Sequence, residues 1–161
     1  METEPQIRLG TPEDMAKMMA LAEMATRENA FVRPSTAKMA IAMWGALTQQ
    51  NGLVGIISDD PGVIQGAVLL TFGQTWYSEV MILEERAIFI HPEYRAAKGG
   101  LAKRLAEFTK KTADTLNNMP LIIGVLSNHR TEGKVRMYRR MFPEEESGVF
   151  FLHNAKTGEW N

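Results

Sequence analysis

The feature that most constrains this chain is a strand that runs through a basic, glycine-containing loop into a helix. Residues 87–108 read AIFIHPEYRAAKGGLAKRLAEF. An apolar run turns at His91-Pro92, and apolar residues at helical spacing follow from Leu101. The first N–H groups of a helix lack intrahelical partners and lie at the positive end of its dipole. Glycines allow close backbone approach, so the stretch predicts a site for phosphate or pyrophosphate.

Charge supports an anionic ligand at this place. Residues 95–140 contain 11 Lys and Arg against 3 Asp and Glu, whereas the whole chain has a net charge of -1. Such a local basic excess predicts a local anion site, or else solvated helix faces. The near-neutral total argues against nucleic-acid binding, which usually goes with a basic domain.

Length and composition indicate one domain spanning residues 1–161. The chain is 45% hydrophobic and has no cysteine, which excludes disulfide frameworks and thiolate metal sites. Its three histidines form no ligand array, so no metal is expected. No apolar run is long enough to span a bilayer and the first residues are acidic, so we expect no membrane association and a cytoplasmic location.

Periodicity and end signals predict a β-α-α-β-β-β-α-β-α-β order, that is, an α/β (α+β) domain. Thr11 and Ser35 are expected to begin the first two helices, and Asp-Asp-Pro-Gly is expected to join two strands. The apolar strand that begins near Leu121 is expected to be buried on both faces. The expected strands are 6–9, two between 52 and 73, 83–90, 120–128 and 148–154; the expected helices are 12–29, 36–50, 98–116 and 132–141.

The loop sequence resembles a known family. IHPEYRAAKGGLA is similar to motif A of the GCN5-related N-acetyltransferases, Arg/Gln-x-x-Gly-x-Gly/Ala after a strand that ends in Val/Ile-x-Pro. Counted from Arg95, Lys98 takes the first glycine position and Gly100 the last. Alternatively the loop is two residues longer, and Gly100-Leu101-Ala102 takes the place of Gly-x-Ala.

A second segment resembles the same family. VRMYRRMF is similar to its Leu-Tyr-x-x-x-Gly-Phe segment, with Tyr138 at the tyrosine position and Phe142 where a glycine is expected. Asn128 ends the preceding apolar strand. With the order of elements, the resemblance covers residues 6–151.

The resemblance implies a mixed, mostly antiparallel central sheet, flanked by about four helices, whose parallel fourth and fifth strands splay apart. It implies that acetyl-coenzyme A binds in that splay as cosubstrate. An amine of a small molecule or a protein would attack the thioester directly through a tetrahedral intermediate. The residues expected at the coenzyme are Phe89, Ile90, His91, Arg95, Ala96, Ala97, Lys98, Gly99, Gly100, Leu101, Ala102 and Asn128.

The same resemblance suggests catalytic groups. Tyr138 is expected to protonate the leaving thiolate, and a backbone N–H near Ile90 to bind the oxyanion. Glu84, six residues before Ile90, is the expected general base, with Glu79 or an ordered water chain as alternatives.

The acceptor amine is expected between the first two helices, their 31–33 connection and the Trp76-Tyr77 loop. Exposed aromatic residues there are equally consistent with contact in a homodimer. The alternative function is a non-catalytic module that binds coenzyme A or a partner. A toxin acting on aminoacyl-tRNA would need a broader basic surface. Acidic residues that suit a cationic amine are Glu28, Glu79, Glu84 and Glu85.

Overall fold

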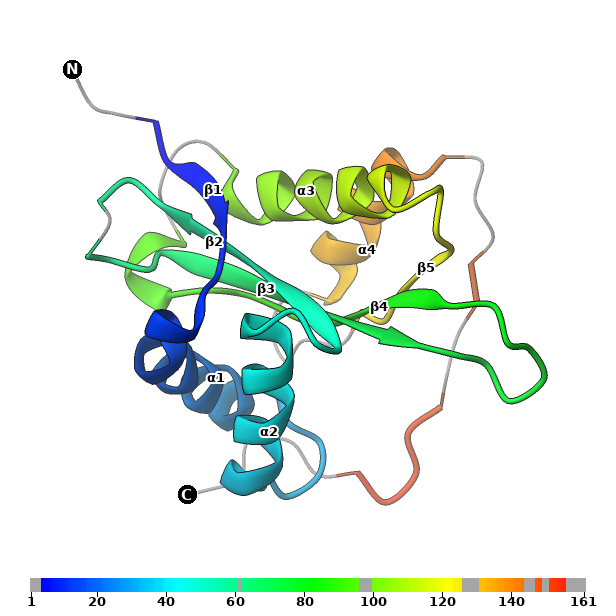
Figure 1. The fold of residues 1–161 in the computed structure, drawn as a ribbon, viewed down its shortest axis with the longest axis horizontal. Helices are drawn as coiled ribbons and strands as arrows, with labels where there is room; N and C mark the ends of the chain where they lie inside the picture. The colour runs from blue at the N-terminus through cyan, green and yellow to red at the C-terminus, as the bar shows by residue number, and fades with distance from the viewer. Residues whose placement is uncertain are drawn as a thin grey trace.

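The computed structural model describes residues 4–60, 62–95, 100–125, 131–143, 147–148 and 151–155. These residues form a five-stranded sheet in the order β1-β2-β3-β4-β5, with helices on both faces (Figure 1). The strands are β1 (Gln6–Leu9), β2 (Gly52–Ser58), β3 (Gly66–Gly73), β4 (Ile82–Ile90) and β5 (Leu121–Ile123). The helices are α1 (Met15–Asn29), α2 (Thr36–Leu47), α3 (Leu101–Thr115) and α4 (Thr131–Met141).

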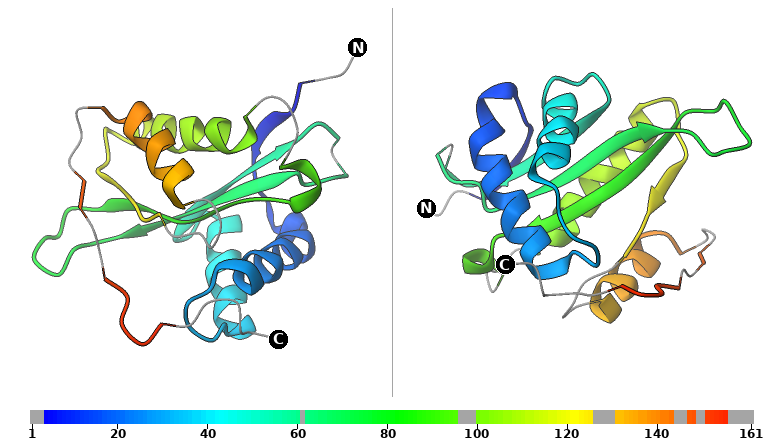
Figure 2. Two further views of the ribbon diagram at one scale, coloured as in Figure 1. Left: turned by 180° about the vertical axis from the view of Figure 1, so that it is seen from behind. Right: turned by 90° about the horizontal axis from the view of Figure 1, so that it is seen from below.

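The strand pairing confirms the predicted fold class. β1 to β4 pair successively in antiparallel fashion, and β5 joins β4 in parallel, from Leu83 opposite Leu121 to Glu85 opposite Ile123. Figures 1 and 2 show α1 and α2 together below the sheet and α3 with α4 on the opposite face. The sheet is therefore mixed and mostly antiparallel, with four α-helices around it.

Each face of the sheet buries its own core. Met18, Met43 and Leu47 from α1 and α2, which recur at helical spacing, pack on one face. Leu101 and Leu105 from α3 pack on the other face. Methionines are flexible enough to fill an irregular core, which is the role that they have here.

A β-bulge divides β4. Leu69 of β3 lies opposite Ala87 and Leu70 lies opposite Glu85, so Arg86 is an extra residue on β4. Side chains alternate along a strand, and the extra residue reverses that alternation. Leu83 before the bulge and Ile88 after it consequently both pack on the α3 side.

Several predicted boundaries differ from the structure. α3 begins at Leu101, after Gly100 at φ 58°, and α2 ends at Leu47. Ile122 of β5 is 49% exposed, so the prediction of burial on both faces was wrong, because β5 is the edge strand of the described sheet. The described residues 151–155 form no strand, and the rest of the expected strand 148–154 lies partly outside the described residues. Within the described ranges, no helix is long and apolar enough to cross a membrane.

Candidate functional site

A cavity of about 790 Å³ lies where β4 ends and α3 begins. Its volume is in the range of small-molecule and cofactor sites. Its lining comes from the end of α1, the end of β4, the 3-10 turn that follows β4, the start of α3, and α4. The lining residues are Glu28, Asn29, Ile88, Phe89, Ile90, Tyr94, Arg95, Gly100, Leu101, Ala102, Thr131, Glu132, Gly133, Lys134, Arg136 and Met137.

The edge of β4 is open along this cavity. The parallel pairing with β5 stops at Glu85, and no other described residue pairs with β4 on that edge as far as Ile90. On the opposite edge, the His91 N–H donates to the Gln65 carbonyl on β3 at 2.8 Å. Antiparallel alternation therefore directs the backbone groups of Ile88 and Ile90 toward the open edge. The Ile88 N–H and carbonyl and the Ile90 N–H are thus directed toward an extended ligand with amide bonds of its own, whereas the Ile90 carbonyl already accepts from Arg95.

The start of α3 supplies the anion-binding geometry. Gly100 caps the helix in the left-handed conformation that favours glycine. The N–H groups of the first turn, from Leu101 and Ala102 onward, lie at the positive end of the helix dipole. Both residues line the cavity. A phosphate at this place would meet unpartnered backbone donors.

Arg95 has a partner that the sequence did not indicate. Its Nη1 and Nη2 atoms donate to the two carboxylate oxygens of Glu28 on α1, at 2.8 and 2.6 Å. Its Nε donates to the Ile90 carbonyl at 3.1 Å, and its guanidinium lies 5.0 Å from the centre of the Phe89 ring. Arg95 therefore ties α1 to the end of β4. The Glu28 carboxylate, expected near a cationic amine, is bound to this guanidinium.

The other residues predicted to contact the coenzyme include two that line the cavity, one that does not, and five that lie outside the described residues. Phe89 and Ile90 line the cavity, whereas His91 does not: its Nδ1 accepts from the Glu93 N–H at 3.2 Å in a short 3-10 turn. The remaining predicted positions lie outside the described residues. They are Ala96, Ala97, Lys98, Gly99 and Asn128.

Tyr138 and Glu85 form a buried pair. The Tyr138 hydroxyl lies 2.9 and 3.1 Å from the two carboxylate oxygens of Glu85, and each residue is 8% exposed. Burial raises the pKa of Glu85 to about 7, although the Tyr138 hydrogen bond and the charge of Lys134 act in the opposite direction. Burial, and then the Glu85 charge, raise the pKa of Tyr138 well above its usual value. The phenol therefore stays protonated, and beside an ionised Glu85 it releases its proton less readily than a free phenol does.

Glu84, the expected base, points to the other face of the sheet. It lies opposite Thr71 in the register, and its Oε2 is 2.6 Å from Nη2 of Arg86. The Nε of Arg86 donates to the Thr71 hydroxyl at 2.9 Å. Glu84 and Glu85 are thus adjacent carboxylates with different surroundings, one in an ion pair and one bound to a phenol.

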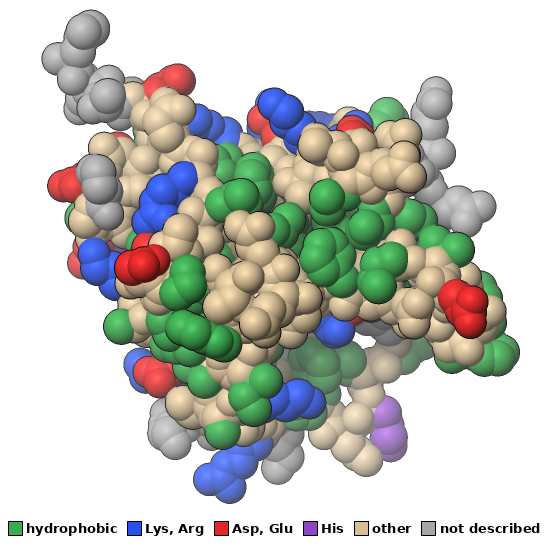
Figure 3. Space-filling model, viewed as in Figure 1, with side chains coloured by type: hydrophobic (Ala, Val, Ile, Leu, Met, Phe, Trp, Pro, Cys, Tyr) green, Lys and Arg blue, Asp and Glu red, His purple; other side chains and the backbone are tan. Residues whose placement is uncertain are grey.

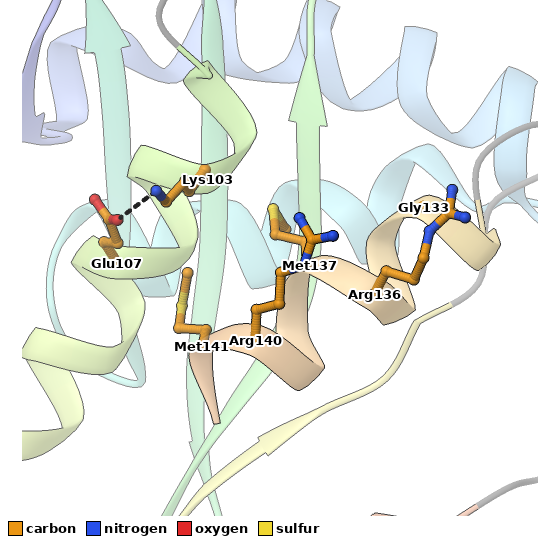
Figure 4. Close-up of a pocket in the computed structure, with 7 residues that line it drawn as sticks. All are labelled: Lys103, Glu107, Gly133, Arg136, Met137, Arg140 and Met141. Atoms are coloured by element: carbon orange, nitrogen blue, oxygen red, sulfur yellow. Dashed lines mark ion pairs between the residues drawn. The ribbon is translucent and has the colours of Figure 1, made fainter. Parts of the chain in front are cut away.

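A second hollow, of about 590 Å³, continues the cavity between α3 and α4. Figure 4 shows α3 with Lys103 and Glu107 beside α4 with Arg136 and Arg140. Lys103 and Glu107 are 3.8 Å apart and both are more than half exposed, so their attraction is weak. Three cations against one carboxylate give this groove a positive charge, and Arg136 also lines the cavity.

The expected acceptor side is apolar and exposed. Trp76 is 94% exposed and contacts Tyr77 edge-to-face, with their ring centres 5.5 Å apart. Figure 3 shows hydrophobic side chains over α1 and α2 and along the sheet toward the β3–β4 hairpin. Val32, in the connection between α1 and α2, is 61% exposed. These residues belong to the segments in which the acceptor amine is expected.

Sequence reasoning missed the α4 contribution to the cavity and the partner of Tyr138. Gly133 and Met137 are four residues apart on α4 and therefore share one face, which is the only signal that the sequence offers for them. The described part of the chain contains no group of three or more His, Cys, Asp or Glu side chains placed to hold a metal ion.

Comparison with protein-family models finds no match, and comparison with curated proteins finds none either. Solved structures do match. An aminoglycoside acetyltransferase from an uncultured soil metagenomic sample, in complex with sisomicin, is 16% identical, with 92% of this chain and 94% of that chain covered at a TM-score of 0.65.

Two further solved structures match over nearly the whole chain. The ribosomal-protein-alanine N-acetyltransferase of Brucella melitensis biovar Abortus 2308 is 14% identical, with coverage of 93% and 99% and a TM-score of 0.67. AAC(6')-Iy, in complex with the bisubstrate analogue CoA-S-monomethyl-acetylneamine, is 17% identical, with coverage of 93% and 97% and a TM-score of 0.63. The chain therefore has the fold of the GCN5-related N-acetyltransferase superfamily, as its two motifs predicted.

Proposed function

We propose that the protein is an N-acetyltransferase that moves the acetyl group of acetyl-coenzyme A to a primary amine of a small molecule or a protein. The observation that carries the proposal is the open edge of β4 beside the N-terminus of α3, within one cavity. Coenzyme A combines an amide-containing pantetheine arm with a pyrophosphate. The open strand edge suits the arm, and the helix start suits the pyrophosphate.

The charge of the neighbouring groove supports the same ligand. Coenzyme A carries a further phosphate on its ribose, and Lys103, Arg136 and Arg140 line the hollow that continues the cavity. A groove of this charge attracts a phosphate monoester. We assign the Gly100-Leu101-Ala102 register to the pyrophosphate because α3 begins at Leu101.

The catalytic roles follow from the two faces of β4. Tyr138, beside the point where β4 and β5 separate, would protonate the departing sulfur. A backbone N–H on the open edge of β4, at the end nearer to Tyr138, would bind the oxyanion of the tetrahedral intermediate. Glu84, on the opposite face, would receive the ammonium proton of the acceptor directly or through water. The named acceptors of the similar structures, an aminoglycoside and a ribosomal protein alanine, define the amines to test first.

The test is to incubate the protein with acetyl-coenzyme A and a panel of aminoglycosides, polyamines and peptides with N-terminal alanine, and to follow free thiol. Thiol release that depends on an amine supports the proposal. A melting shift with coenzyme A but no thiol release with any amine contradicts it and favours the non-catalytic binding module. In the Arg140→Glu variant, the shift should shrink, most strongly at low salt.

A further inference from the structure

The buried pair of Glu85 and Tyr138 is more than a packing contact. A single phenolic proton lies between the Tyr138 oxygen and a carboxylate, at 2.9 and 3.1 Å from its two oxygens. Both residues are more than nine-tenths buried. Burying an ionised carboxyl group is costly unless the group is well paired. Carboxyl groups whose pKa is shifted by burial are often found at functional sites. This hydrogen bond directs the phenolic proton toward Glu85 and away from any substrate.

The pair occupies the inner end of the splay. Glu85 is the last β4 residue that pairs with β5, opposite Ile123, and the open edge of β4 begins immediately after it. An acyl group bound along the open edge would end at this point. Neither Tyr138 nor Glu85 is among the residues that line the cavity, although Met137, next to Tyr138 on α4, is one of them. The Tyr138 hydroxyl would meet a sulfur atom from beneath this end of the cavity, with Glu85 behind it.

The surroundings of the pair set its protonation. Lys134, on α4 one turn before Tyr138, is the charge that acts on Glu85. From α3, Lys110 reaches the same region, with its Nζ 5.1 Å from the Phe142 ring that stacks on Tyr138. The β-strand neighbours Leu70 and Ile123 are apolar. Burial outweighs the nearby charge, so Glu85 is about half protonated near pH 7.

We propose that Glu85 is a positioning residue that completes Tyr138 as a two-proton relay, an inference that rests on the proposed acetyl transfer. When Glu85 is protonated, its carboxyl proton bonds to the phenolic oxygen, and the phenolic proton is free to point toward the sulfur. As the bond between the acyl carbon and sulfur breaks, its electron pair stays on sulfur. Sulfur takes the phenolic proton, and the phenolic oxygen takes the Glu85 proton.

The relay ends with a thiol, a neutral Tyr138 and an ionised Glu85, which regains its proton from water before the next turnover. Because the relay needs the Glu85 proton, the reaction rate should depend on pH. Ionised Glu85 holds the phenolic hydrogen bond to itself, so the acid is available only below the pKa of Glu85. The rate at saturating substrates should therefore fall as the pH rises through about 7.

The first test compares Glu85→Gln with Glu23→Gln, which neutralises an exposed carboxylate on α1. We measure kcat from pH 5.5 to 9 at saturating acetyl-coenzyme A and amine. The wild type and Glu23→Gln should decline above about pH 7. Glu85→Gln should lack this decline and should lose about 10-fold in kcat at pH 6, with an unchanged KM for acetyl-coenzyme A. A decline near pH 7 that persists in Glu85→Gln, or an unchanged kcat at pH 6, overturns the relay.

The second test needs no turnover. In protein labelled with 13C at the glutamate carboxyl carbons, the resonance that is missing in Glu85→Gln belongs to Glu85. It should titrate near pH 7, and at higher pH in Tyr138→Phe, because the phenol hydrogen bond stabilises the carboxylate. Titration near pH 4.5 overturns the relay and leaves the proposed function standing. Titration near pH 7 in a protein that acetylates no amine overturns the proposed function, and the relay with it.

Discussion

The two halves of β4 have opposite relations to their neighbours. From Ile82 to Glu85 the strand is paired on both edges, and Leu83 is fully buried. From Ala87 to Ile90 it is paired with β3 alone among the described residues, and its other edge faces the cavity. The bulge at Arg86 separates the halves. The first half is held by neighbours on both edges, and the second directs the backbone groups of Ile88 and the Ile90 N–H toward the cavity, while the Ile90 carbonyl accepts from Arg95.

The largest expected effect belongs to the group at the boundary between these halves. Tyr138→Phe should lower kcat by about 100-fold, because general acid catalysis contributes at least that much when a proton transfer is required. The KM for acetyl-coenzyme A should hardly change, since the open half of β4 and the start of α3 remain intact. Steady-state kinetics with the best amine checks both values. A variant with wild-type kcat would remove Tyr138 from the mechanism.

A matched pair of core substitutions compares the halves directly. Leu83→Ala should lower the free energy of unfolding by about 2–5 kcal/mol, because Leu83 is completely buried in the closed half. Ile88→Ala, in the open half, should cost about 1–2 kcal/mol, because its side chain is only partly buried. Urea unfolding measures both. Equal losses would mean that the two halves are equally packed.

The protonation of Glu85 should make stability depend on pH. Its pKa is about 7 in the folded protein and 4.5 when exposed, so the folded state binds more protons between these values. Its contribution to the free energy of unfolding is complete below about pH 4.5 and is lost as the pH rises through 7. The loss amounts to about 3 kcal/mol. Relative to the wild type, Glu85→Gln should therefore gain stability from pH 5 to pH 8. A difference that stays constant with pH would place the Glu85 pKa at its ordinary value.

The smallest expected effect on stability belongs to Glu84. Its partner Arg86 has a side chain that is 60% exposed, so Glu84→Gln should change the free energy of unfolding by less than about 1 kcal/mol. If Glu84 receives the acceptor proton, amine acetylation should nevertheless slow measurably. Unchanged kinetics in this variant would assign the proton to water or to another carboxylate.

The open half of β4 was largely predictable from the sequence. The turn at His91-Pro92 and the glycines that precede Leu101 are local signals, and they placed the strand end and the helix start together. The fold class followed from the order of elements. Local patterns of this kind indicate where a strand ends and a helix begins. An anion site at a helix start is formed by backbone N–H groups, so its position follows from the same signals.

The closed half and the side-chain pairs were less predictable. Simple alternation places Glu84 and Ile90 on one face of β4, but the extra residue Arg86 places them on opposite faces, and no sequence signal marks the bulge. The pairing of Arg95 with Glu28 joins residues 67 positions apart. Such contacts depend on how the elements pack, so they appear only in the structure.

Amide hydrogen exchange, followed by NMR with and without coenzyme A, tests the central claim most directly. The claim is that the open edge of β4 binds the pantetheine arm. The Ile88 and Ile90 amides should exchange more slowly when the coenzyme is bound, whereas the Leu83 amide, which already donates to the Pro120 carbonyl at 2.8 Å, should not change. Coenzyme binding that leaves both open-edge amides unprotected would contradict the account.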